Sequence, residues 1–99
     1  MTEPREIDRL VHEPGRLSIL VGLAHVEEAE FSFLVETLGM TRGNFAAHVA
    51  RLEEHGLVER SKAFVDDRPR TTYRLTAEGR RRLREYRRSM RALLSAIPG

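Results

Sequence analysis

Asn44 and Arg51 are two polar side chains whose types suit the recognition of DNA bases. An amide can pair with the edge of adenine and a guanidinium with the edge of guanine, each through two hydrogen bonds. Both belong to the segment MTRGNFAAHVARLEEHG, residues 40–56. At 100° per residue they lie with Ala47 on one side of a helix. The other side carries three large apolar residues that are expected to face a core, Phe45, Val49 and Leu52.

The start of this expected helix carries little bulk. Thr41 is a favourable N-cap and Gly56 a favourable C-terminal stop, but Gly43 stands where Ala would be favoured by up to ~1 kcal/mol. Small residues at Gly43 and Ala47 would let the helix approach bases or phosphates closely. The alternative is an ordinary surface helix, because Ala is the best helix former and exposed Asn and Arg are common on such surfaces.

Length and composition favour one small domain, residues 1–99, with one modest core. The chain has no cysteine, which excludes disulfides and thiolate metal sites. No apolar run reaches the ~18 residues that a membrane span needs, and the N-terminus lacks the apolar stretch of a signal peptide. We therefore expect a cytoplasmic protein that does not bind a membrane.

The charge is unevenly distributed along the chain. Residues 1–59 contain five basic and eleven acidic residues, a balance of −6, whereas residues 60–99 contain twelve basic and four acidic residues, a balance of +8. This asymmetry favours a polyanionic partner for the second half. The alternative is a well-solvated, arginine-rich helix.

Two helices are expected at the N-terminal end. The first covers residues 4–12, with Pro4 near its start. Its apolar stripe consists of Ile7, Leu10 and Val11. A second helix is expected over residues 16–26, after the interruption EPG.

Two shorter helices then form a helix-turn-helix unit over residues 32–55. Ser32 is expected to cap the first of them, which ends at Gly39. The second is the helix that begins at Thr41. A tight turn containing Gly39 joins the two helices.

After Gly56 the pattern changes to β-branched and aromatic residues, which predicts a two-stranded hairpin over residues 57–75 with the turn DDRP at 66–69. Thr76 is expected to cap a last helix over residues 77–97. Helix-turn-helix, hairpin and helix is the winged-helix order. We expect a mainly α protein with a small β-hairpin (α+β), a winged helix-turn-helix with additional N- and C-terminal helices.

The expected hairpin, or wing, is rich in cations, namely Arg60, Lys62, Arg68 and Arg70. The predicted turn places Arg68 at the exposed tip, where it would suit the narrow, negative minor groove of DNA. Asp66 and Asp67 would face the same phosphates, or they would hold Arg68 or Arg70 in place. The alternative is a structural hairpin with solubilising charges.

The chain resembles the small winged-helix DNA-binding transcriptional regulators that are related to the MarR and ArsR families. The resemblance rests on RLSIL..L upstream, LG.T.GN entering the helix at Thr41, H...LE..GLV leaving it, and K.F....P.T.Y.LT..GR through the hairpin into the last helix. It covers Arg16 to Leu94. It implies a homodimeric repressor or activator with the helix from Thr41 to His55 in the major groove, a wing around Arg68, and dimerisation through the terminal helices.

The residues and the resemblance together define a set of candidate DNA-binding residues, Thr41, Arg42, Gly43, Asn44, Ala47, His48, Arg51, Lys62, Arg68 and Arg70. The chain departs from the family pattern at Ala46 and Ala47, where small hydroxyl residues are common, and at Arg42, where an acidic residue is frequent. The target sequence therefore does not carry over. ArsR-type metal sensing often uses cysteines, which this chain lacks.

The last helix carries an apolar stripe at steps of three and four residues, Leu83, Tyr86, Met90, Leu93 and Ile97, with Leu94 adjacent. We expect this stripe to join the stripe of the N-terminal helix across a two-fold axis, with Ile7, Leu10 and Val11 in the interface. DNA readers commonly bind paired half-sites as dimers. The alternative is a stripe that packs only on its own domain.

Other classes of function have less support. No Ser-His-Asp order, HExxH, phosphate loop or GxGxxG occurs, so an enzyme is not expected. His48 and His55 are two turns apart, about 10 Å along a helix axis, which is too far for one metal ion. No metal and no cofactor are expected. Alternatives are a winged helix that binds a protein partner, and a sensor of a metal or of an unknown small-molecule effector.

Overall fold

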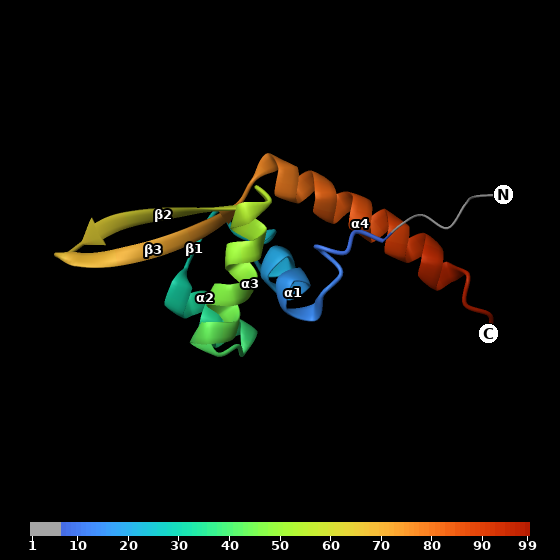
Figure 1. Ribbon diagram of the computed structural model, residues 1–99, viewed down its shortest axis with the longest axis horizontal. Coiled ribbons are helices and arrows are strands. Elements are labelled where there is room, and N and C mark those ends of the chain that lie inside the picture. The colour runs from blue at the N-terminus through green and yellow to red at the C-terminus, as the bar shows by residue number, and fades with distance from the viewer. Residues whose placement is uncertain (1–6) are drawn as a thin grey trace.

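The computed structural model describes residues 7–99, which form four helices and one three-stranded antiparallel sheet (Figure 1). In chain order the elements are α1 Pro14–Leu23, β1 Ala29–Glu30, α2 Phe31–Leu38, α3 Arg42–Glu54, β2 Val58–Val65, β3 Arg68–Leu75 and α4 Ala77–Ser95. This is the expected winged-helix arrangement of helices with a small antiparallel sheet. None of the helices in the described part of the chain is long and apolar enough to cross a membrane.

The predicted N-terminal helix over residues 4–12 is wrong for the part that the structure describes. Residues 7–13, here called the strap, form no helix. Residues 4–6 lie outside the described part, and residues 7–12 contain only a turn. The Asp8 carboxylate accepts hydrogen bonds from the backbone N–H groups of Leu10 and Val11. Together with the bond from the N–H of His12 to the carbonyl oxygen of Asp8, they form a single turn that does not continue as a helix. Glu13 then adopts an extended backbone before Pro14 and caps α1 by accepting from the N–H of Arg16 at 2.7 Å.

The core lies between α1, α3 and the base of the sheet. Its largest fully buried side chains are Val11, Ile19, Leu20, Leu23, Phe45, Leu52, Leu57 and Val58. The ring of Phe45 packs edge-on against Phe31, at 5.1 Å between centroids, and against Tyr73, at 5.5 Å. This cluster fixes α3 against α2 and β3, because aromatic pairs in such geometry add to the burial of their apolar area.

The sheet has the order β1–β3–β2. The two-residue strand β1 was not expected from the sequence. It pairs Ala29 with Tyr73, and Glu30 with Thr72. It leads directly into α2, which Glu30 precedes, so Ser32 is inside α2 and is not its N-cap.

β2 and β3 form the wing, residues 58–75, which projects from the body on the side away from the C-terminal end of α4 (Figure 1). Its turn is Asp66–Asp67 alone, both with positive φ, at 53° and 61°. Arg68 therefore starts β3 opposite Val65 and does not occupy the tip, which corrects the predicted turn over 66–69. Asp tolerates left-handed backbone better than most residues, which favours this tight turn.

The start of α4 fits closely against the end of α3. Thr76 donates its hydroxyl to the carbonyl oxygen of Gly56 at 2.7 Å and accepts from the N–H of Gly79 at 2.9 Å. A Cβ on Gly79 would lie 2.1 Å from the carbonyl oxygen of Leu57. Glycine is therefore required at position 79 for this approach of backbone to backbone.

Candidate nucleic-acid interface

The outer face of α3, defined by Gly43, Asn44, Ala47 and Arg51, is exposed to solvent. The opposite face of the same helix is buried in the core through Phe45, Val49 and Leu52, as their spacing predicts. The helix is therefore anchored along one side and presents an amide, a guanidinium and two small residues along the other. This surface combines hydrogen-bonding groups for base edges with little bulk.

The N-terminal end of α3 is held in a defined conformation. The Thr41 hydroxyl accepts from the N–H of Asn44 at 3.1 Å, so Thr41 is the N-cap that the sequence predicts. The guanidinium of Arg42 stacks over the ring of Phe31, at 4.8 Å from its centroid. A Cβ on Gly43 would meet no atom within 4 Å. The fold of the single chain therefore gives no reason for glycine at position 43.

His48 does not lie on the outer face. Its ring is partly buried, with Nδ1 3.5 Å from the Glu13 carboxylate. A Cβ on Gly15 would lie 2.6 Å from this ring, so glycine at 15 lets α1 approach it closely. His48, a predicted DNA-binding residue, thus faces the strap and the start of α1.

Three arginines of the wing are paired with carboxylates. Arg70 binds Glu30 at 2.8 Å, Arg60 lies 3.3 Å from Glu53, and Arg74 binds Glu59. Arg70 is therefore engaged by β1. Neither Asp66 nor Asp67 holds Arg70 in the ion pairs found among residues 7–99. Lys62 and Arg68 are exposed on the outer part of the wing.

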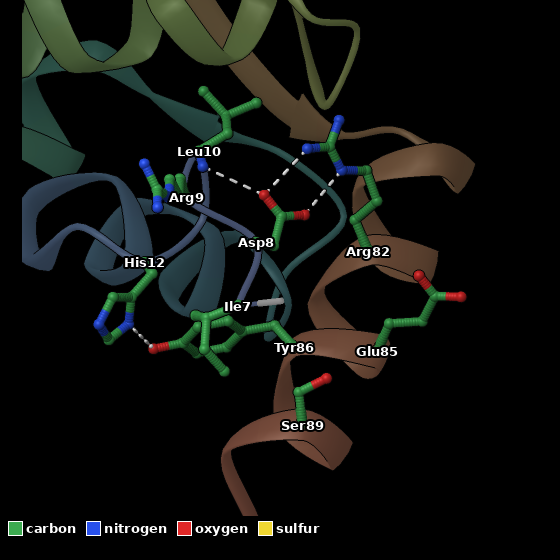
Figure 2. A pocket seen from close by; sticks show the side chains of 9 residues that line it. All are labelled: Ile7, Asp8, Arg9, Leu10, His12, Arg82, Glu85, Tyr86 and Ser89. Atoms are coloured by element: carbon green, nitrogen blue, oxygen red, sulfur yellow. Dashed lines mark hydrogen bonds and ion pairs between the residues drawn. The ribbon is translucent and has the colours of Figure 1, made fainter. Parts of the chain in front are cut away.

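The strap is bound to α4 by two side-chain pairs that sequence reasoning did not find (Figure 2). The Asp8 carboxylate accepts two hydrogen bonds from the Arg82 guanidinium, and the His12 ring shares a hydrogen bond of 2.7 Å with the Tyr86 hydroxyl. Burial of Asp8 favours its neutral form, but the bonds from Arg82 and from the Val11 N–H outweigh this and hold its pKa below the ordinary value. The same pairing raises the pKa of Arg82.

The residues predicted for a dimer interface divide into three groups. Val11 and Tyr86 are buried in their own chain, at 0% and 8% exposure, so they leave little surface for the predicted interface. Four others are partly buried against the same core, namely Ile7, Leu10, Leu83 and Met90. Three stay exposed near the C-terminal end of α4, namely Leu93, Leu94 and Ile97.

An apolar groove of about 980 Å³ runs between α1 and α4. Its apolar lining includes Leu17, Val21, Leu83, Met90 and Leu94, and its arginines are Arg84, Arg87 and Arg91. Val21, which lines this groove, is 44% exposed although it belongs to a helix of the core. The groove therefore offers apolar surface that the single chain leaves open.

Residues 7–99 bring together no cluster of three or more histidine, cysteine, aspartate or glutamate side chains that could hold a metal ion. His48 is engaged by Glu13, and His12 by Tyr86.

Two sequence comparisons agree with this arrangement. Residues 16–94 match the family described as winged helix DNA-binding domain. The uncharacterized protein MJ0432 of Methanocaldococcus jannaschii is 38% identical over 71 residues, which are 72% of this chain and 77% of that protein.

Solved structures resemble the fold along most of its length. A transcriptional regulator homologue from Pyrococcus horikoshii OT3 has a TM-score of 0.83 and 32% identity, over 89% of this chain and 87% of its own. NadR, solved in complex with 4-hydroxyphenylacetate, has a TM-score of 0.72 and 27% identity, over 91% of this chain and 63% of its own. The similar structures include further transcriptional regulators.

Proposed function

Since this chain belongs to the family of winged helix DNA-binding domains, we propose that it is a sequence-specific transcriptional regulator that binds double-stranded DNA as a homodimer. Its fold is that of a winged-helix transcriptional regulator. In the proposed complex α3 enters the major groove and the wing lies at the adjoining minor groove. A protein with this function is located where the DNA is, and we propose that this is the cytoplasm. The proposal assigns no catalytic residue and no cofactor.

The observation that carries the proposal is the open outer face of α3. Gly43 has no neighbour within 4 Å of an added Cβ, and Ala47 is exposed one turn later. An amphipathic helix whose free side is small and hydrogen-bonding can lie deep in a groove. A bulky residue at position 43 would hold the helix away from the bases.

We assign distinct roles to the residues of this surface. Asn44 and Arg51 contact base edges, for which an amide and a guanidinium are suited. Thr41 and Arg42, at the positive N-terminal end of α3, contact a phosphate. Arg68 and Lys62 are the wing cations that remain available for DNA, whereas Arg70 is bound to Glu30 and His48 to Glu13.

We place the dimer interface on α4 and the groove beside α1. Leu93, Leu94 and Ile97 are exposed in the single chain at 49%, 56% and 66%. Burying one Leu side chain stabilises the dimer by about 1.5–3 kcal/mol. This exceeds the screened repulsion between surface arginines of the two copies. A second α4 helix would cover these residues, with Ile7 and Leu10 of the strap nearby.

A second candidate function is a response to a small molecule. The α1–α4 groove has an apolar lining and three arginines, which suits an apolar ligand with a negative group. The similar protein NadR was solved in complex with 4-hydroxyphenylacetate. A ligand in this groove would act on the proposed dimer contact. A winged helix that binds only a protein partner is the remaining alternative.

Selection of bound duplexes from a random DNA pool tests the proposal. The expected result is a two-fold symmetric consensus whose half-site centres lie about one helical turn, ~34 Å, apart. The Asn44→Ala/Arg51→Ala double variant is the control and should enrich no consensus. Binding by the unmodified protein without any enriched sequence would contradict sequence-specific regulation and favour the protein-interaction alternative.

A further inference from the structure

Phe64 is the most exposed large apolar side chain in residues 7–99, with 77% of its surface accessible. Its neighbour Val65 is 42% exposed, and its cross-strand partner Pro69 is exposed as well. Val58 and Leu75, at the base of the same hairpin, are buried. The outer wing, residues 62–69, therefore carries apolar surface that the core does not use.

The register of the hairpin places Phe64 on the face that is turned toward α3. Side chains alternate between the two faces along a strand. Phe64 pairs with Pro69, and the same-face pair four residues nearer the body is Arg60 with Tyr73. The Tyr73 ring packs on Phe45 of α3. Phe64 thus extends the α3 side of the wing beyond the body of the domain.

The charges of the outer wing cancel one another. Lys62 and Arg68 are balanced by Asp66 and Asp67. The other wing arginines, Arg60, Arg70 and Arg74, are paired with Glu53, Glu30 and Glu59. The outer wing therefore has no net positive charge that would attract it to DNA phosphates. An apolar side chain that enters between base steps of the minor groove does not depend on net charge.

Two features restrict the backbone beneath Phe64. The two-residue turn at Asp66–Asp67 closes the hairpin directly, and the ring of Pro69 fixes φ opposite Phe64. In such a hairpin this pair is not joined by backbone hydrogen bonds, so proline costs no ladder bond. A restricted backbone narrows the range of positions that the Phe64 ring can take.

We infer that Phe64, supported by Pro69, is an apolar wedge that enters the minor groove beside the major-groove site of α3. This inference rests on the proposed function. The ring would partly unstack one base step, which is easiest at pyrimidine–purine steps such as TA and CA. Phe64 would thereby add sequence preference at a step where no base-edge hydrogen bond is made.

The test uses the full chain and the duplex that the random-pool selection yields. 2-Aminopurine is placed in turn at each step flanking the α3 site, and its fluorescence reports unstacking when protein binds. Affinity is measured for duplexes with TA or AA at the responding step. The variants are Phe64→Ala, the conservative Phe64→Leu, and the matched control Val65→Ala, whose side chain lies on the other face.

Unmodified protein and Val65→Ala should both raise the fluorescence at one flanking step and prefer TA there. Phe64→Ala should lose the fluorescence change, the preference, and about tenfold in affinity for the TA duplex. Phe64→Leu should keep part of each.

Unchanged affinity, preference and fluorescence in Phe64→Ala, on a duplex that the unmodified protein binds specifically, would overturn this inference and leave the proposed function standing. Failure of the unmodified protein to bind any duplex would overturn both. Loss of self-association in Phe64→Ala with DNA preference intact would also overturn the inference, because the patch would then contact a second copy.

Discussion

The Asp8 carboxylate accepts two hydrogen bonds from the Arg82 guanidinium, from Nε at 2.9 Å and from a terminal nitrogen at 3.0 Å, and so fastens the strap to α4 (Figure 2). The same carboxylate accepts from the N–H groups of Leu10 and Val11. One side chain therefore shapes the strap and ties it to α4. Bidentate pairs of this kind are more favourable than isolated ion contacts.

Asp8→Asn should lower the free energy of unfolding by about 1 kcal/mol at pH 7. Because the folded-state pKa of Asp8 lies below the ordinary value of 3.8, its contribution is present above that value and is lost as the pH falls through the folded-state pKa. The difference between variant and unmodified protein in urea unfolding should therefore shrink as the pH is lowered from 5 towards 2.

Glu78→Gln is the matched control, since Glu78 forms an exposed pair with Arg81 that surface screening weakens. It should barely change stability at pH 7. A difference for Asp8→Asn that stays constant over the whole pH range would show that the charge of Asp8 is not the stabilising feature.

The buried face of α3 and the order of elements from α2 to α4 could be predicted because they depend on local patterns. Thr41 and Thr76 cap helices, and Phe45, Val49 and Leu52 are buried at helical spacing. Caps and periodic apolar faces are visible within a few residues of sequence.

The conformation of the strap and the burial of the apolar stripe of α4 could not be predicted in this way. Both depend on contacts between residues that are far apart in the sequence. Asp8 and Arg82 are 74 positions apart, as are His12 and Tyr86. Tyr86 belongs by its spacing to the apolar stripe of α4, which was expected to be exposed, yet its side chain is buried against its own domain. The prediction of the wing turn was wrong for a local reason. Asp66 and Asp67 both adopt left-handed backbone, so two residues close the hairpin where a four-residue turn was expected.

Gly79→Ala should destabilise the fold by at least about 2 kcal/mol, because the new methyl group would meet the carbonyl oxygen of Leu57. Chemical unfolding measures the loss. Gly43→Ala is the matched control. It lies in a helix with open space around its Cβ, so it should gain up to ~1 kcal/mol. Equal effects of the two substitutions would show that close approach at Gly79 is not needed.

Gly43→Leu should leave the fold intact and abolish DNA binding. Leu is a good helix former and its Cβ meets nothing within the chain, but its side chain would separate α3 from the groove floor. Circular dichroism checks the fold, and fluorescence anisotropy with the selected duplex checks binding. Normal affinity in a folded Gly43→Leu protein would mean that the bare start of α3 has no role in DNA contact.

Leu94→Glu should convert the proposed homodimer into a folded monomer. Leu94 is 56% exposed and lines the α1–α4 groove, so its charge would lie in the contact without disturbing the core. Ala92→Glu, an exposed position about 200° away around α4, adds the same charge and should remain dimeric. Sedimentation velocity at micromolar concentration distinguishes them. An unmodified protein that sediments as a monomer would contradict the dimer.

The central claim is that the outer face of α3 reads base sequence, and Arg51→Ala tests it most directly. Equilibrium affinity is measured by anisotropy at fixed salt for the selected duplex and for a duplex of scrambled sequence, with the unmodified protein and with the variant. The predicted result is a loss of ~1–3 kcal/mol on the selected duplex, little change on the scrambled one, and relaxed preference at particular base pairs. An equal loss on both duplexes would contradict the account, because Arg51 would then contact only the DNA backbone.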